Sequence, residues 1–193
     1  MPLENPQRSA EEFKLREAIS SIEAMNIGSE SRAQMILVLL NLKPAFELGL
    51  YPWNASPEEA EASLKRTNLK YIRSEKPKQQ KTVAEYAVSK EKQIAEELIN
   101  CKSSAKYGAL MGYPETAIQA YEAKEVYTGP LPEDIKNSIF HFKFSKEHFQ
   151  EEFETVRKWN ATLSEYAPKL VEEYVVSTPT AEQYEDNWEF KKI

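Results

Sequence analysis

The run Tyr107-Gly108-Ala109-Leu110-Met111-Gly112-Tyr113-Pro114-Glu115-Thr116-Ala117 interrupts a sequence whose apolar residues otherwise recur mostly at helical spacing. Gly112 suits the left-handed residue that follows the end of a helix, where any side chain would clash. Pro114 favours an extended Tyr113 and fits the first position of a new helix, where its missing N–H costs nothing. The run therefore predicts a helix, a sharp corner at Gly112–Pro114 and a second helix.

The segments before this corner predict more helix and one small sheet. The run from Met35 to Leu42 is apolar on every side, which is typical of a helix in the centre of a core. Ser56-Pro57-Glu58-Glu59 combines a capping serine, a proline and acids at a helix start. The segments Leu69–Arg73 and Thr82–Val88 predict a hairpin, although the second would also tolerate a helix.

The segments after the corner predict one strand and one long helix. Phe140, Phe142 and Phe144 alternate with polar residues, which is the period of a half-buried strand. Ser145 suits the cap of the longest helix, which Pro168 kinks or divides. The aromatic tail 177–193 is expected to dock on its own domain or on a partner. We therefore predict one domain, residues 1–193, that is mainly helical (α+β) with a small antiparallel sheet or hairpin.

Composition narrows the class of protein. The chain has 193 residues, 41% hydrophobic content and a net charge of −6, which together indicate a folded, water-soluble domain. No segment approaches the ~20 apolar residues that span a bilayer, and the first residues lack the basic and apolar regions of a signal peptide. Its single cysteine, Cys101, excludes an intramolecular disulfide. These features predict a soluble cytoplasmic protein without a membrane partner.

The Gly112 corner is the best candidate for a ligand site. A tyrosine stands where a capping serine or aspartate is usual, so the amides of the new helix would lack a side-chain partner and attract an anion. Tyrosine hydroxyls and a glycine at this place would allow close approach, whereas the negative charge of Glu115 opposes an anion. A simple packing corner between two helices is the alternative. The candidate ligand-binding residues are Tyr107, Gly108, Gly112, Tyr113, Glu115 and Thr116.

The corner also resembles a segment, Leu-x-Gly-Tyr-Pro followed by a small residue, of small uncharacterised prokaryotic proteins. Here it reads Leu110-Met111-Gly112-Tyr113-Pro114-Glu115-Thr116-Ala117. The resemblance covers little of the chain and implies no activity. Some of these segments carry cysteines after the proline, and this chain has Thr116 and Ala117 there, so no thiol chemistry follows.

A basic stretch at residues 65–81 is a candidate contact for nucleic acid. Its cations would grip RNA phosphates while an aromatic ring stacks on a base. The alternative is a solvated hairpin tip, or a patch that pairs with the acidic C-terminal half, and the negative net charge favours that alternative. The candidate nucleic-acid residues are Lys70, Tyr71, Arg73, Lys76, Lys78 and Lys81.

Metal and thiol chemistry have weaker support. His148 and Glu152 share one helical face, and His141 would complete a three-ligand metal site if the preceding strand folded back. A surface histidine beside a glutamate is the alternative, and it is the commoner arrangement. The lysines around Cys101 would activate a thiolate, yet a structural thiol is the commoner case. We expect no metal and no cofactor.

The sequence contains no phosphate loop, no dinucleotide fingerprint and no nucleophile elbow. The leading hypothesis is a non-enzymatic protein that binds a protein partner, a second copy of itself or a ligand. Its contacts would be the tail with Trp188, the corner, or Trp159 and Tyr166 if these face outward. The two alternatives are an enzyme or binder of a small anionic ligand at the corner, and an RNA-binding protein.

Overall fold

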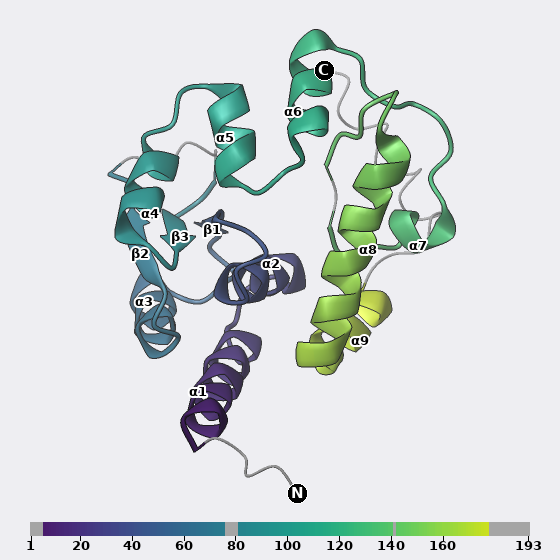
Figure 1. Cartoon of the computed structure of the whole chain (residues 1–193). Helices are drawn as coiled ribbons and strands as arrows, with labels where there is room; N and C mark the ends of the chain where they lie inside the picture. Colours follow the sequence, from purple (N-terminus) through teal and green to yellow (C-terminus); the bar gives the residue numbers. More distant parts are fainter. Residues whose placement is uncertain (1–5, 76–80, 141, 178–193) are drawn as a thin grey trace, which may run out of the picture.

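A computed structural model describes residues 6–75, 81–140 and 142–177. These residues form a mainly helical α+β fold with one small antiparallel sheet, which confirms the predicted fold class (Figure 1). In chain order the elements are α1 (Pro6–Glu23), α2 (Ser29–Leu39), β1 (Ala45–Leu50), α3 (Pro57–Arg66), β2 (Lys70–Arg73), β3 (Ala84–Ser89), α4 (Lys92–Ile99), α5 (Ser104–Leu110), α6 (Glu115–Ala123), α7 (Glu133–Lys136), α8 (Phe149–Tyr166) and α9 (Pro168–Ser177).

The sheet has the order β1-β3-β2, and both pairings are antiparallel. The pairing of β2 with β3 confirms the predicted hairpin between residues 69 and 88. Strand β1 was not predicted, although Phe46, Leu48 and Leu50 alternate as a half-buried strand requires. Leu48 pairs with Tyr86 in the central strand, and both side chains are fully buried.

Helix α2 lies in the centre of the fold, as its apolar sequence predicts. Every residue from Arg32 to Leu39 is buried, and the helix contacts α1, β1, β3, α8 and α9. It therefore joins the sheet and α3–α5 on one side of the molecule to α8 and α9 on the other (Figure 1). The helix ends at Leu39 rather than Leu42, and Asn41 takes a positive φ of 59° in the turn that leads to β1.

Several helix boundaries follow from local chemistry. Ser56 accepts a hydrogen bond from the Glu59 amide while the Glu59 carboxylate accepts one from the Ser56 amide, so the predicted capping box is present. The predicted cap at Ser145 is wrong, because α8 begins at Phe149 with His148 as its N-cap and without a side-chain cap. The Ser145 hydroxyl accepts a bond from the His148 amide in the turn before the helix. Pro168 divides the long helical region into α8 and α9, as one of the two expected outcomes.

The predicted strand over Phe140–Phe144 is wrong. Ser145, directly after this segment, makes an isolated bridge to Val126. In the part of the chain that the structure describes, no strand forms a ladder with the three phenylalanines, so their alternation produces an extended segment that packs on a helix. Phe140 meets Trp159 edge-on at 5.6 Å between ring centroids, and Phe144 meets Phe153 at 4.8 Å.

Most of the buried apolar residues from α1 to α9 belong to one hydrophobic cluster, which does not include Ala55 or the buried residues Ala117, Ile118 and Ala120 of α6. Residues 178–193 lie outside the described part of the chain, so the predicted docking of the tail 177–193 stays a prediction. None of the helices in the described ranges is both long enough and apolar enough to cross a membrane.

Candidate functional site

The corner after α5 is built from backbone hydrogen bonds. The Tyr113 amide donates to the Gly108 carbonyl oxygen at 3.0 Å, and the Gly112 amide donates to that of Ala109 at 3.0 Å. This pair of bonds is the Schellman arrangement, in which the residue after the cap is left-handed. Gly112 has a φ of +75°, so the prediction of a left-handed glycine is confirmed.

The second helix starts one residue later than predicted. Pro114 has a φ of −54° and a ψ of 140°, which makes it the N-cap, and α6 begins at Glu115. The ring of Pro114 disfavours helical backbone at Tyr113. The turn at Gly112 is therefore complete before α6 begins at Glu115. Pro114 has no side-chain acceptor for the first amides of α6. Helix α6 therefore lacks a side-chain cap, as predicted, but its N-cap residue is Pro114 and not Tyr113.

The outer face of the corner packs on the chain that leads into β1. A Cβ atom added to Gly112 would lie 3.0 Å from Pro44 Cδ and 3.3 Å from Lys43 Cα. Because these neighbours include backbone, they have little freedom to move aside. Gly112 is thus required both by its φ and by a close approach to Lys43 and Pro44.

Lys43 is a buried cation beneath the corner. Its side chain is 2% exposed, its Nζ donates to Gln34 Oε1, and it lies 5.1 Å from the Tyr113 ring centroid and 4.8 Å from that of Trp159. Burial lowers the pKa of Lys43 to about 7, and the negative charge of Glu30 opposes this shift. Its cation–π contacts also favour the charged form.

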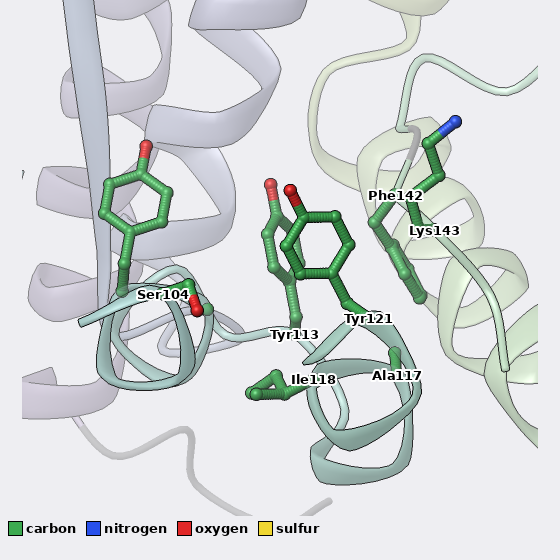
Figure 2. Close-up of a pocket in the computed structure, with 9 residues that line it drawn as sticks. Ser104, Tyr113, Ala117, Ile118, Tyr121, Phe142 and Lys143 are labelled. Carbon is green, nitrogen blue, oxygen red and sulfur yellow. The ribbon is translucent and has the colours of Figure 1, made fainter. Parts of the chain in front are cut away.

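A pocket of about 330 Å³ opens beside the corner, between α5, α6 and the segment that precedes α8 (Figure 2). This volume lies at the lower end of the range of small-molecule sites in proteins. Aromatic and small apolar residues form most of its wall. The lining residues are Ser104, Tyr107, Gly108, Tyr113, Ala117, Ile118, Tyr121, Phe142 and Lys143.

The pocket has an apolar end and a polar end. In Figure 2 the hydroxyls of Tyr113 and Tyr121 point in the same direction, away from Ile118 and Ala117, and the Lys143 ammonium lies on the side of the hydroxyls. Tyr113 also stacks on Phe142 with 5.4 Å between ring centroids, so the Tyr113 ring is fixed.

The tyrosine hydroxyls in the pocket are hydrogen-bond donors at neutral pH. Burial, followed by the carboxylate of Glu47, raises the pKa of Tyr107, and Glu47 also shares a hydrogen bond with its hydroxyl. Burial and the negative charge of Glu30 raise the pKa of Tyr113. Both groups keep their protons, because ionising a phenol near carboxylates in an apolar wall is unfavourable.

The structure brings together only part of the predicted ligand site. Tyr107, Gly108 and Tyr113 line the pocket, whereas Gly112 faces Lys43 behind it. The exposed Glu115 carboxylate accepts a hydrogen bond from Gln119. Thr116 has a structural contact, described next.

Thr116 joins α6 to α8 through a buried carboxylate. Its hydroxyl donates to Glu152 Oε1 at 2.6 Å, and Glu152 Oε2 accepts the Ser145 amide at 2.7 Å. Glu152 is 1% exposed, and these bonds occupy both of its oxygens. Thr116 therefore anchors the start of α6.

Several pocket residues are absent from the predicted set. Ala117, Ile118 and Tyr121 share one face of α6, and this helical spacing was visible in the sequence. Phe142 and Lys143 come from a segment with a separate position in the sequence, so no local pattern links them to the corner. Gly108 lets α5 approach α6, because a Cβ there would lie 2.9 Å from Ile118 Cγ1.

The structure spreads the predicted nucleic-acid residues over β2 and the loop after it. Arg73 pairs with Glu61 at 3.6 Å, and the Tyr71 hydroxyl lies 3.5 Å from the same carboxylate. Lys70 is exposed at the far end of β2, and Lys81 is exposed after the undescribed residues 76–80. Lys76 and Lys78 fall within that gap, so RNA binding stays a prediction.

The positions of His148 and Cys101 do not support a metal site or an activated thiol. His148 Nδ1 lies 3.7 Å from Glu151, while Glu152 is bonded to Thr116 and Ser145. His141 is outside the described residues. Within residues 6–75, 81–140 and 142–177, no group of three or more His, Cys, Asp or Glu side chains is placed to hold a metal. Cys101 donates to the Ser103 carbonyl at 3.3 Å.

Trp159 of α8 does not face outward, so it is not an exposed aromatic anchor. This side chain is 3% exposed and packs in the core against Phe140 and Phe142.

Comparisons of the whole chain with protein-family models, with curated proteins and with solved structures found no match.

Proposed function

We propose that this chain is a cytoplasmic binding protein that holds a small, largely apolar ligand in the pocket beside the Gly112 corner. The observation that carries this proposal is the pocket itself, about 330 Å³ in volume and walled by four aromatic rings and the small residues of α5 and α6. Pockets that combine apolar walls with a few polar groups are the usual form of a small-molecule site.

The rigidity of the wall supports binding as well. Tyr113 is held between its contacts with Lys43 and Phe142, and Tyr107 is bonded to Glu47. A wall that is already fixed loses little side-chain entropy when a ligand enters. The Ser104 hydroxyl donates to the Glu122 carboxylate, and no histidine or cysteine is among the described lining residues, so binding is favoured over catalysis.

The experiment is a ligand-observed NMR screen of small aromatic and aliphatic compounds against three proteins. Ser104→Trp places an indole at the exposed edge of the pocket without altering a buried residue. Ala109→Trp places the same ring on an exposed position of α5 that does not line the pocket. We expect compounds that bind the wild type and Ala109→Trp but lose binding to Ser104→Trp. Binding that survives in Ser104→Trp would place the site elsewhere and contradict the proposal.

Association with a protein partner or a second copy is a second proposal, and it rests on Trp53. This side chain is 70% exposed and stacks on Tyr51 with 5.1 Å between ring centroids and 6° between planes, in the turn after β1. Exposed, rigid aromatic rings are typical anchors of interfaces. Sedimentation velocity of the wild type and Trp53→Ser tests self-association. A concentration-dependent dimer that persists in Trp53→Ser would exclude Trp53 as its anchor.

A further inference from the structure

The geometry points to a ligand with one anionic group, such as a carboxylate, which lies against Lys143 and the hydroxyls of Tyr113 and Tyr121. This inference rests on the proposed function, because it names the class of molecule that the pocket would hold. The rest of that ligand is apolar and lies against Gly108, Ala117 and Ile118.

The first argument is the charge of the pocket wall. Lys143 is the one charged side chain among the described lining residues. Its ammonium also makes no ion pair with any described residue of the chain. A cation at the mouth of an apolar pocket that has no counter-charge among the described residues favours an anion there.

The second argument concerns which hydroxyls at the pocket wall are available to donate a hydrogen bond to a ligand. Two of the hydroxyls at the wall already have acidic partners, since Ser104 donates to Glu122 at 2.8 Å and Tyr107 shares a hydrogen bond with Glu47. The hydroxyls of Tyr113 and Tyr121 have no hydrogen-bond partner among the described residues. Together with Lys143 they form a set of three donors, and an ionised carboxylate is a pure acceptor with room for several bonds.

The third argument limits the charge to a single group at the polar end. The carboxylate of Glu47 shares a hydrogen bond with the Tyr107 hydroxyl, so a negative charge already lies against that part of the wall. A second anionic group deeper in the pocket would face this negative field. Its apolar lining would also leave that group without hydrogen bonds. The pocket therefore selects a monoanion with an apolar body over a dianion.

The test uses three matched pairs of probes: naphthalene-2-carboxylate, indole-3-acetate and 4-phenylbutyrate, each beside its neutral primary amide. Each probe is titrated into ¹⁵N-labelled full-length protein, and Kd is taken from the amide signals of Gly108, Tyr113 and Lys143. Two variants with the same change in net charge are compared. Lys143→Gln removes the pocket cation, and Lys146→Gln removes an exposed lysine three residues away that does not line this pocket.

We expect the carboxylates to bind about tenfold more tightly than their amides. In Lys143→Gln the Kd of the carboxylates should rise about three- to tenfold, as for one partly exposed charge-assisted contact, and that of the amides should stay unchanged. Lys146→Gln should behave as the wild type. Amides that bind as tightly as carboxylates, or equal effects in the two variants, would overturn this inference and leave the pocket as a binding site. If none of the six probes moves the three signals, the proposed function itself fails.

Discussion

The Lys43 ammonium lies 5.1 Å from the centroid of the Tyr113 ring, so a buried cation in the segment before β1 supports one wall of the pocket beside the Gly112 corner. The same ammonium contacts Trp159 of α8 at 4.8 Å. Lys43 therefore joins three parts of the chain: the strand side, the corner and the long helix. The Tyr113 ring therefore packs on a charged side chain that does not itself line the pocket.

Replacing Lys43 should make the stability of the protein less dependent on pH. The pKa of Lys43 in the folded state, about 7, is below the ordinary lysine pKa of 10.5 that applies to the unfolded chain. Between these values the unfolded chain binds more protons, so the free energy of unfolding rises with pH. The two ring contacts moderate the effect, and we expect the wild type to gain about 2 kcal/mol relative to Lys43→Met between about pH 6.5 and pH 9.5.

Urea denaturation of both proteins at the two pH values measures this difference, because other titrating groups contribute equally to each. Exposed Lys14→Met serves as the control for loss of a lysine. A constant difference between wild type and Lys43→Met would show that the pKa of Lys43 is not lowered in the folded state. If Lys43→Met gained stability relative to the wild type as pH rises, the direction of the predicted pH dependence would be wrong.

Gly112→Ala should destabilise the protein by about 2 kcal/mol or more. The substitution combines a left-handed φ of +75° with a Cβ that would lie 3.0 Å from Pro44 Cδ. Gly28→Ala is the matched control, because nothing lies within 4 Å of its Cβ position and its φ is −56°. There we expect a loss below about 1 kcal/mol in thermal or urea unfolding. Equal losses would argue that Gly112 is not held against Lys43 and Pro44.

Loss of the hydroxyl should change the stability of the protein at Tyr107 but not at Tyr113, although both line one pocket. Tyr107→Phe removes a hydrogen bond to Glu47 and should lower the free energy of unfolding by about 1 to 2 kcal/mol. The Tyr113 hydroxyl has no partner among the described residues, so Tyr113→Phe should leave stability unchanged within about 0.5 kcal/mol. Tyr113→Phe should instead weaken the binding of carboxylate probes. If Tyr113→Phe unfolds more easily than Tyr107→Phe, the assignment of these hydroxyls is wrong.

Glu152→Gln should destabilise the junction between α6 and α8 by about 1 to 3 kcal/mol. The two carboxylate oxygens accept from Thr116 and Ser145, and an amide offers only one acceptor oxygen and places a donor beside a donor. The neighbouring Glu151→Gln changes the same charge on an exposed side chain. Urea denaturation should show no more than about 0.5 kcal/mol for this control. Similar losses in both variants would show that the buried bonds contribute nothing specific.

Local chemistry made much of the fold predictable. Gly112, the Ser56 capping box and Pro168 fix backbone geometry through their own residues, so their effects are visible without tertiary information. The phenylalanines at 140, 142 and 144 show the limit of such patterns. Alternation indicates only which side of the segment is buried. A strand also needs a neighbouring strand to pair with, and the local sequence does not reveal whether one is there.

The candidate site was predicted only where it is local. Tyr107, Gly108 and Tyr113 belong to the corner itself and line the pocket. Lys143 reaches the pocket through the path of the chain after α7, and Lys43 supports it through the path before β1. Thr116 was predicted with the corner but does not line this pocket, and its hydroxyl bonds to Glu152, which lies 36 residues further along the chain. Contacts of this kind depend on packing and have no sequence pattern.

The most direct test of the account is an NMR titration of naphthalene-2-carboxylate into the wild type and into Ser104→Trp. The account predicts saturable shifts of the Gly108, Tyr113 and Lys143 amide signals in the wild type, and their loss when an indole occupies the exposed edge of the pocket. Shifts that persist in Ser104→Trp, or that appear on residues away from the pocket, would contradict binding beside the Gly112 corner.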